Sequence, residues 1–311
     1  MRVIVTGALG HIGSALLGRL TALKRSDLEI VAIDDLKSQR FVTIGGLPQH
    51  SFRLLPLDVR DGLSQVGLQP ADTVVHLAAL AEPQRSAANP DEAFGHNVDC
   101  TKSVVSECAR SGAHLIFPSS TSIYTGEGQV DERASDTHMQ PTNPYSRAKL
   151  IEESLIRNSP AGDRSTIFRL GTVFGVSPGI RFTTAVNKFC WQAAVGAQID
   201  VYEQALNQVR PYLGVRDAAE SLLSAVVDRE LFAGQTINVA STHATVADVL
   251  NLIRAQGLRV ATQTVPSPSA GQGSFSVSLD KASRVGLHPT DSLQSGVAAV
   301  LNYLSSIHRV G

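Results

Sequence analysis

The sequence contains few cysteines and has almost no net charge. Its three cysteines, Cys100, Cys108 and Cys190, are an odd number without CxxC spacing, so we expect neither disulfides nor a zinc site, and no metal centre is predicted. The formal net charge is −1, which offers no basis for electrostatic capture of nucleic acid or of an anionic membrane. Disulfide-rich secreted domains and basic nucleic-acid-binding proteins are therefore excluded.

Long apolar runs, internal repeats and low-complexity tracts are also absent from the sequence. No run approaches the length of a membrane span. The first residues lead directly into a short apolar segment and not into the regions of a signal peptide. We therefore expect a cytoplasmic protein with no membrane partner. A length of 311 residues and a hydrophobic content of 43% suit one large α/β domain or a domain with an appended lobe.

The N-terminal segment, residues 2–20, has the pattern of a buried strand, a glycine turn and a helix. Its residues 3–5 are apolar and β-branched, which is typical of a central parallel strand. In the TGALGHIG that follows, Gly7 permits a sharp turn, Gly10 lets the backbone approach a pyrophosphate, and Gly13 lets the helix pack closely on the sheet. The first N–H groups of that helix would face the phosphates.

A second apolar run, residues 28–33, ends in two acidic residues, Asp34 and Asp35. They follow the glycines by about 20 residues, the place where a dinucleotide site needs an acid for the adenosine ribose. A carboxylate there accepts hydrogen bonds from both ribose hydroxyls and repels a 2′-phosphate. The pattern therefore favours NAD over NADP, although Lys37 and Arg40 leave NADP open. An ordinary turn acid at a strand end is the alternative for Asp34.

The rest of the chain alternates strands with helices. Helices are predicted at residues 89–111 and from Tyr145 onward. Further strands are predicted at residues 51–57, 72–79, 114–118, 165–170 and 236–239. This rhythm predicts a doubly wound parallel sheet of the Rossmann type, with the active site outside the carboxyl ends of the strands.

Two polar residues near these strands could serve either the fold or a ligand. Asp58 follows the third strand, where an acid can meet the adenine amino group, and a structural role and a binding role are equally supported there. His76 lies inside the apolar run of the fourth strand. We interpret it as a hydrogen-bonded core histidine in preference to a catalytic base.

The reactive chemistry is predicted after the fifth strand. A serine cluster, residues 119–122, opens at its carboxyl end, and PTNPYSRAK then places Tyr145 and Lys149 on one helix face. An ammonium beside a phenol stabilises the phenolate, so the tyrosine can take a proton from a sugar hydroxyl while hydride leaves the same carbon for nicotinamide. Lys149 can also hold the nicotinamide ribose, and Ser120 can share the substrate oxygen. A lone YxxxK usually marks only a helix face, but here it follows the glycine loop, the acid and the serines in order.

The order of these motifs resembles that of the extended short-chain dehydrogenase/reductase family, the nucleotide-sugar epimerases and dehydratases, over nearly the whole chain. The segments that carry the resemblance are TGALGHIG, Asp34, DVRD, HLAA, Asn97, SSTSIY, YSRAK, RLGTVFG, RPYLGVRDAA and LDKASRVGLHP. The resemblance implies an NAD-binding Rossmann domain in residues 1–172, to which segment 210–240 returns. It implies a smaller nucleotide-sugar-binding lobe in residues 173–311, and a homodimer formed through the helices predicted at 89–111 and 145–157.

The resemblance also implies roles for individual residues. The catalytic positions fall on Ser120, Tyr145 and Lys149. Cofactor contacts are implied for Gly7, Gly10, His11, Ile12, Gly13, Asp34, Asp35, Asp58, Val59, Leu77, Ala78, Ala79, Asn97, Tyr145 and Lys149. Substrate contacts are implied for Ser120, Thr121, Thr172, Arg181 and Arg210. A planar guanidinium at position 210 suits a diphosphate, with a solvated strand-edge arginine as the alternative.

Several positions depart from the family pattern. Thr172 replaces a usual asparagine, Thr125 replaces a usual glycine, and segment 266–273 offers no second arginine. Thr121 and Ser122 stand where family dehydratases carry Asp-Glu, so dehydration has no evident acid/base pair. The sequence therefore predicts an NAD-dependent nucleotide-sugar epimerase that acts at C4 through a transient 4-keto intermediate. The alternative is an NAD(P)H-dependent 4-keto nucleotide-sugar reductase, and a 4,6-dehydratase or a non-catalytic dinucleotide sensor is less favoured.

Overall fold

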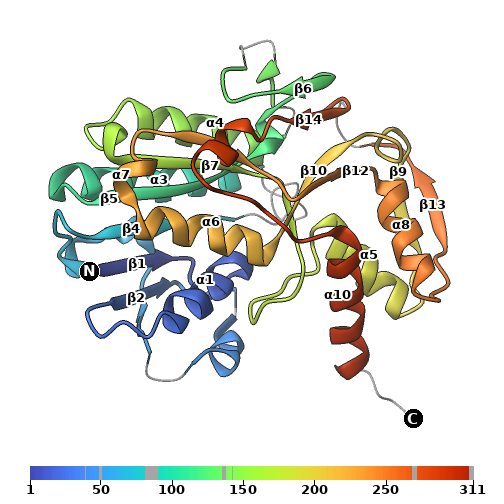
Figure 1. Ribbon diagram of the computed structural model, residues 1–311, viewed down its shortest axis with the longest axis horizontal. Coiled ribbons are helices and arrows are strands. Elements are labelled where there is room, and N and C mark those ends of the chain that lie inside the picture. Colours follow the sequence, from blue (N-terminus) through green and yellow to red (C-terminus); the bar gives the residue numbers. More distant parts are fainter. Residues whose placement is uncertain are drawn as a thin grey trace.

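The structure has a large sheet flanked by helices, and beside it a group of shorter strands and helices that includes the C-terminal helix (Figure 1). It is a computed structural model that describes residues 1–38, 40–48, 51–80, 90–134, 138–141, 143–267 and 272–307. The N-terminal strand lies within the large sheet, so the chain begins in the part that the glycine motif organises.

Seven parallel strands form the large sheet in the order β11-β7-β5-β4-β1-β2-β3. They are β1 (Arg2–Thr6), β2 (Glu29–Asp34), β3 (Arg53–Pro56), β4 (Thr73–His76), β5 (His114–Ser120), β7 (Ser165–Leu170) and β11 (Thr236–Val239). All seven are predicted from the sequence, with ends that differ by a few residues at most. The strand order reverses between β1 and β4, and a crevice forms at such a switch point. The predicted doubly wound fold is confirmed.

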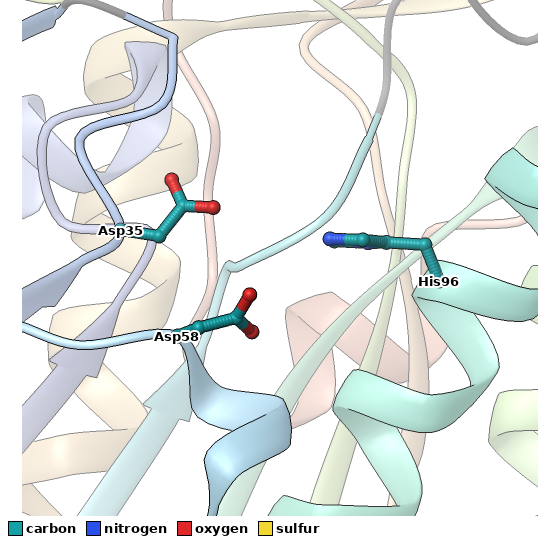
Figure 2. Close-up of side chains that lie close together, drawn as sticks. All are labelled: Asp35, Asp58 and His96. Carbon is teal, nitrogen blue, oxygen red and sulfur yellow. The ribbon is translucent and has the colours of Figure 1, made fainter.

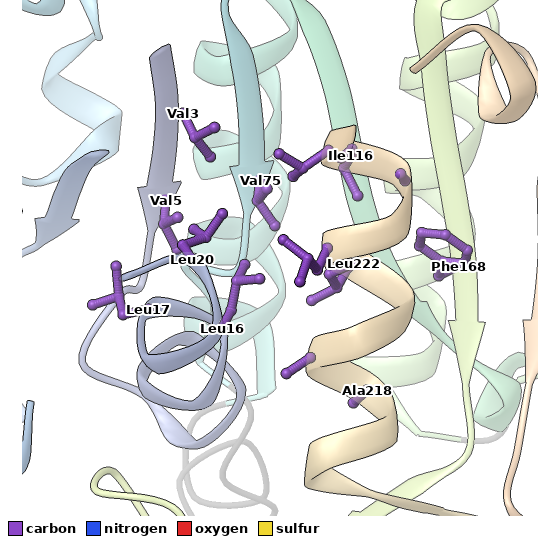
Figure 3. Close-up of a cluster of buried hydrophobic side chains, with 14 of the residues drawn as sticks. Val3, Val5, Leu16, Leu17, Leu20, Val75, Ile116, Phe168, Ala218 and Leu222 are labelled. Atoms are coloured by element: carbon purple, nitrogen blue, oxygen red, sulfur yellow. The ribbon is translucent and has the colours of Figure 1, made fainter. Parts of the chain in front are cut away.

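Alternate side chains of the strands inside the large sheet are buried on its opposite faces, whereas those of the edge strand β3 are half-buried or exposed. Val3 and Val5 of β1 pack with residues of two helices on one face, and Figure 3 shows this cluster with Leu222 among them. Ile4 packs with residues of two other helices on the opposite face. The four helices are, in the same order, α1 (His11–Ala22) and α6 (Val215–Val227), then α3 (Pro90–Ser111) and α4 (Pro144–Arg157).

Smaller sheets and helices complete the described part of the chain. The strands pair as β12-β10-β8, β13-β9 and β14-β6. Their bounds are β6 (Gly128–Val130), β8 (Thr172–Phe174), β9 (Ile199–Tyr202), β10 (Arg210–Gly214), β12 (Thr242–Ala244), β13 (Thr262–Val265) and β14 (Phe275–Val277). The remaining helices are α5 (Ala185–Ala194), α7 (Arg229–Phe232), α8 (Val246–Ala255), α9 (Asp280–Arg284) and α10 (Leu293–Ile307). Helices α5, α8 and α10 share an apolar core of their own, separate from those of the large sheet.

Helix α4 begins where its side chains can cap it. The Asn143 side chain accepts a hydrogen bond of 2.9 Å from the Ser146 N–H, and Pro144 occupies the first turn. These two signals fix the helical register from its first residue. Tyr145 therefore lies in the first turn, and Lys149 lies one turn further on the same face.

The helix predicted at residues 89–111 is α3, which begins at Pro90. Asn89 lies outside the described residues. In the part of the chain that the structure describes, no helix combines the length and the apolar character needed to cross a membrane.

Leu222 provides a test of the packing of α6 on the sheet. Its side chain is fully buried, whereas Val227 on the same helix is 57% exposed. We expect Leu222→Ala to lower the free energy of unfolding by about 2–5 kcal/mol, because it leaves a cavity. Val227→Ala is the matched control and should change it by roughly 0.5 kcal/mol or less. Urea unfolding of both variants measures this, and equal effects would contradict the described packing.

Candidate active site

A cleft of about 1390 Å³ lies outside the carboxyl ends of the central strands. Its walls include the glycine loop after β1 and the residues that end or follow β2, β4, β5 and β7. The segment after β3, the start of α4 and parts of α3 and α5 also contribute to the lining. The cleft therefore brings together segments from both halves of the sheet and from the smaller lobe, as expected at a switch point of a doubly wound fold.

The glycine loop passes so close to its neighbours that side chains would not fit. Gly7 has a φ of +62°, and a Cβ on it would lie 2.6 Å from the carbonyl carbon of Leu77. A Cβ on Gly13 would lie 2.5 Å from the carbonyl oxygen of Gly7. Gly10 is the N-cap of α1 and brings no side chain to the first N–H groups of that helix. His11 and Ile12 follow, and all three glycines line the cleft, so this loop fits a pyrophosphate at a helix N-terminus.

Asp34, the last residue of β2, contacts the glycine loop. Its carboxylate accepts hydrogen bonds of 3.1 Å from the N–H groups of Leu9 and Leu36. Asp35, the next residue, accepts from the Lys37 N–H at 3.1 Å. Both carboxyl groups belong to residues that line the cleft, and Asp34 is the more buried of the two. The loop and the acid that the sequence predicts for NAD are therefore in contact.

Asp35, Asp58 and His96 form a cluster at the Asp34 side of the cleft (Figure 2). One polar atom from each lies within 4.8 Å of the others. The carboxylate of Asp58, however, already pairs with Lys37 Nζ and Arg60 Nη2, each at 2.6 Å. The hydrogen bonds from Arg60 and Lys37 hold the pKa of Asp58 well below its usual range. Two cations thus balance the charge that a metal ion would need, and the distances alone do not make this a metal site.

His76 is buried between two hydroxyl groups. Its Nδ1 lies 2.8 Å from Thr6 Oγ1 and its Nε2 lies 3.2 Å from Thr101 Oγ1. Burial, with a smaller effect from the charge of Lys149, lowers the pKa of His76 to about 3. The imidazole is therefore neutral near pH 7, and the interpretation of His76 as a hydrogen-bonded core histidine agrees with the structure.

Ser120, Tyr145 and Lys149 all line the cleft. Ser120 ends β5, and its Oγ accepts a hydrogen bond of 3.1 Å from the Ser122 N–H. Lys149 Nζ lies 5.8 Å from the centroid of the Tyr145 ring and 4.4 Å from that of Phe117. Burial opposes the charge of this ammonium, but negative groups around it, Glu152 first among them, hold the pKa of Lys149 above its ordinary value. A charged lysine therefore lies beside the predicted catalytic tyrosine.

Two predicted contact residues lie behind the cleft wall. Asn97 is buried, and its side chain accepts from the N–H of Leu80 at 2.7 Å and donates to the carbonyl of Leu80 at 3.1 Å. It thus supports the segment after β4, where Leu77, Ala78 and Ala79 line the cleft. The buried Thr121 donates to the carbonyl of Leu170 at 3.2 Å. Neither residue is part of the cleft lining in this structure.

Among the remaining predicted residues, Val59, Thr172 and Arg181 line the cleft, and Arg210 does not. The guanidinium of Arg210 donates to the carbonyls of Val209 and Gly273 and to the side chain of Gln208. Sequence reasoning missed several lining residues of the lobe, including Lys188, Trp191 and Tyr202. It also missed Glu152, for which the spacing of three residues from Lys149 on a helix was the available signal.

Comparison with known proteins decides the family. The model of the NAD-dependent epimerase/dehydratase family matches residues 3–240. The chain belongs to this family. The finding confirms the resemblance seen in the sequence and the prediction of NAD as cofactor. The glycine loop, which has no room for a side chain at Gly7 or Gly13 and ends at a helix N-terminus, fits that cofactor.

Individual relatives of this family member are similar over most of its length. An uncharacterized UDP-glucose epimerase, YtcB of Bacillus subtilis, is 27% identical, and the match covers 99% of this chain and 99% of YtcB. The UDP-glucose 4-epimerase of Azospirillum brasilense is 29% identical over 73% of this chain and 68% of its own. The solved structure of MoeE5 in complex with UDP-glucuronic acid and NAD has a TM-score of 0.82 and 25% identity, covering 99% of this chain and 100% of MoeE5.

Asp34 provides a test of cofactor recognition. We expect the unmodified protein to bind NAD more tightly than NADP, and Asp34→Ala to weaken NAD binding by roughly 10-fold to 100-fold while reducing the discrimination, because hydrogen bonds to a charged group are lost. Titration with each cofactor, followed by the fluorescence of Trp191 in the cleft, measures both affinities. Asp27→Ala, which removes an exposed acid before β2, is the control and should change neither. Equal affinity of the unmodified protein for the two cofactors would refute the role of Asp34.

Proposed function

We propose that the protein is an NAD-dependent UDP-sugar 4-epimerase. The observation that carries the proposal is the meeting of Ser120, Tyr145 and Lys149 with the glycine loop in one cleft. The names of the relatives supply the nucleotide: two are UDP-glucose epimerases, and the MoeE5 structure holds UDP-glucuronic acid with NAD. Family membership supports a redox step that leaves the cofactor unchanged after each turnover.

In the proposed mechanism the protein moves a proton and holds the sugar while its C4 is oxidised and reduced again. NAD, when bound, supplies the hydride acceptor and donor for C4. Tyr145 takes the proton of the C4 hydroxyl and later returns it. The ammonium of Lys149 stabilises the phenolate and holds the nicotinamide ribose, and Ser120 shares the substrate oxygen. Turning of the 4-keto sugar within the lobe exposes its other face before reduction.

The two ends of the cleft are proposed to bind different molecules. Residues 1–172, with segment 210–240, would bind NAD, and the lobe within residues 173–311 would bind the nucleotide sugar. Cofactor contacts are proposed for the glycine loop, Asp34, Asp35, Asp58, Val59, the segment after β4, Tyr145 and Lys149, with Asn97 acting behind the wall. Substrate contacts are proposed for Ser120, Thr172, Arg181 and Arg210, with Thr121 acting from behind the wall. The exposed aromatic rings of Trp191 and Tyr202 line the same cleft and add a surface for the ligand.

The serine cluster argues against dehydration. Thr121 and Ser122, which follow Ser120, bear hydroxyls where an acid/base pair would have to act. The Thr121 hydroxyl donates to the carbonyl of Leu170, and the Ser122 hydroxyl accepts from that of Ser146 at 2.9 Å. Both hydroxyls thus help to hold the loop, and neither residue is a carboxylic acid of the kind expected for proton transfer at C5.

The fate of hydrogen distinguishes epimerisation from its alternatives. We expect UDP-glucose or UDP-glucuronic acid, incubated with enzyme and catalytic NAD in D₂O, to give a second epimer of equal mass without deuterium at carbon. Tyr145→Phe should keep NAD binding and lose roughly 10²–10⁴-fold in rate, because general acid/base catalysis contributes that much. NMR and mass spectrometry of the sugar measure the outcome. Loss of water would identify a dehydratase, and product formed only with stoichiometric NADH or NADPH would identify a reductase.

Arg210 lies outside the cleft lining and forms its hydrogen bonds with neutral groups among the described residues. Its hydrogen-bond acceptors in the described part of the chain are two carbonyls and the amide oxygen of Gln208, and its guanidinium lies 5.1 Å from the centroid of the Phe275 ring. Burial lowers its pKa from the ordinary value. A partly buried guanidinium with no carboxylate among these partners favours the approach of an anion, which supports the proposed contact with a diphosphate.

We expect Arg210→Ala to raise the KM for the nucleotide sugar by about 10-fold or more and to leave the affinity for NAD nearly unchanged. A contact with the diphosphate exists in both ground state and transition state, so its loss weakens uniform binding. Arg133→Ala, which removes an arginine that is 91% exposed, is the control. Steady-state kinetics and NAD titration measure the two effects, and an unchanged KM would assign Arg210 to the strand edge.

We further propose a homodimer and a cytoplasmic location. Helices α3 and α4 pack side by side on one face of the sheet, and the apolar side chain of Ile151 on α4 is 41% exposed. Such a pair of helices offers a surface for a second copy. All three cysteines are buried and unpaired, which fits a reducing compartment.

A further inference from the structure

Glu152 is a buried acid that faces the lysine of the site. It lies three residues after Lys149 on α4, and the Lys149 Nζ to Glu152 Oε2 distance is 3.1 Å. Their side chains are 5% and 1% exposed. A buried charge is costly unless it is paired. Glu153, the next residue, pairs instead with Arg169 at 2.8 Å and with Arg157, so the two adjacent carboxylates hold different cations.

A chain of hydrogen bonds fixes the Glu152 carboxylate from behind. Its Oε1 accepts from Thr101 Oγ1 at 2.9 Å. Thr101 Oγ1 lies 3.2 Å from His76 Nε2, and His76 Nδ1 lies 2.8 Å from Thr6 Oγ1. Thr6 Oγ1 accepts from the Ala78 N–H at 3.2 Å. The chain therefore connects α4, through α3 and β4, to the strand ends that form the cofactor cleft.

The donor and acceptor properties of these side chains give all the hydrogen bonds of the network the same direction. A carboxylate can only accept hydrogen bonds, so the Thr101 hydroxyl donates its one proton to Glu152. Thr101 must then accept a hydrogen bond from His76 Nε2–H. A neutral imidazole with a proton on Nε2 has a bare Nδ1, which accepts from the hydroxyl of Thr6. Each donor thus points toward Glu152. The burial that lowers the pKa of His76 to about 3 keeps the imidazole in this neutral form.

We propose that Glu152 is a positioning residue of the active site, whose carboxylate keeps the Lys149 ammonium charged and directed along α4 toward Tyr145. The inference rests on the proposed role of Lys149 beside Tyr145. An ammonium in a dry pocket would otherwise favour its neutral form and could not stabilise a phenolate. Lys149 would then lose its positive charge while staying beside Tyr145.

The other groups around Lys149 supply less of this negative charge than Glu152 does. On α4, Glu153 is engaged with Arg169 of β7. From β4, His76 is neutral, and from β5 the Phe117 ring contributes only its π-face. From α3, Cys100 stays protonated because burial raises the pKa of its thiol to about 12. Among the described residues, Glu152 is the acid that forms an ion pair with the Lys149 ammonium.

Glu152→Gln tests the proposal in the NAD-loaded protein. Glutamine keeps the shape and can still accept from Thr101, but it removes the charge. We expect the alkaline limb of the kcat profile to move to lower pH by about one pH unit or more, because a buried lysine without a counter-ion loses its proton more easily. The KM for the nucleotide sugar should change less than twofold. Glu107→Gln, which breaks a pair with Arg110 on the surface of α3, is the matched control and should not move the limb.

A second measurement does not need turnover. Lysine labelled with ¹³C at Cε reports protonation by NMR, and Lys149→Met identifies the signal of Lys149. That signal should titrate at lower pH in Glu152→Gln than in the unmodified protein, and in Thr101→Val, which keeps the charge but frees the carboxylate, it should shift by a smaller amount. Thr101→Val serves as the test if Glu152→Gln does not fold. Failure of the unmodified protein to epimerise any UDP-sugar would reject the proposed function and leave this titration valid.

An unmoved titration of Lys149 in folded Glu152→Gln overturns the proposal. So does a uniform fall in kcat at every pH with an unmoved alkaline limb, because a merely structural role predicts that result. If only Thr101→Val folds, an unmoved Lys149 signal in that variant overturns it.

Discussion

The geometry of the site depends on the buried ion pair between Glu153 and Arg169. Arg169 of β7 donates from Nε and Nη2 to the Glu153 carboxylate of α4 at 3.0 and 2.8 Å. Burial alone would raise the pKa of Glu153, but the hydrogen bonds and charge of Arg169 hold it below its ordinary value. The same carboxylate accepts from the Ser119 hydroxyl at 2.5 Å. One anion thus joins the helix that carries Tyr145 to the strand end that carries Ser120.

The network extends from Arg169 to the edge of the sheet. Its Nη1 donates to the Tyr124 hydroxyl at 2.6 Å, and that hydroxyl donates to Asn238 Oδ1 of β11 at 2.9 Å. These bonds hold the loop after the serines on the sheet, and Arg169, Tyr124 and Asn238 do not line the cleft. Because a buried charge whose partner is removed costs about 3–5 kcal/mol, α4 has little freedom to shift along the sheet. Helical geometry then separates two functions: successive residues point in different directions, so Glu153 anchors the helix while Glu152 faces Lys149.

Much of the fold and part of the site follow from short-range patterns. Most of the seven strands are predictable because they are apolar runs that contain β-branched residues, and such runs occur where both faces of a sheet are covered. The edge strand β3 has no β-branched residue and is predicted from its apolar residues and its place in the strand–helix alternation. The glycine loop and the order of Ser120, Tyr145 and Lys149 are predictable because their chemistry needs those residue types at those places. The three-residue strands β6, β8, β12 and β14 could not be predicted, since so few residues carry no periodicity.

Residues whose roles depend on the packing of distant segments were also beyond the sequence patterns. Asn97 supports the cleft wall through the backbone of Leu80, and the side chain of Arg210 turns to the carbonyls of Val209 and Gly273. Two of these partners are set by tertiary structure: Leu80 is 17 residues from Asn97, and Gly273 is 63 residues from Arg210. A motif can name such residues as important without saying whether they touch a ligand or hold the residue that does.

The same reasoning explains why the catalytic residues are easier to predict from the sequence than the residues that select the substrate. Lys149 is buried and must be paired with an acid. The residues around it must therefore fit one another, and few combinations of side chains satisfy this requirement. Trp191 and Tyr202, which the lobe contributes to the cleft, are 42% and 46% exposed and meet no such requirement. A chain with the same glycine loop and the same α4 could therefore carry different residues at these lobe positions and act on a different nucleotide sugar. Under the proposed function, selection among nucleotide sugars is to be sought in the lobe, whereas the proposed chemistry depends on the buried pairs of α4.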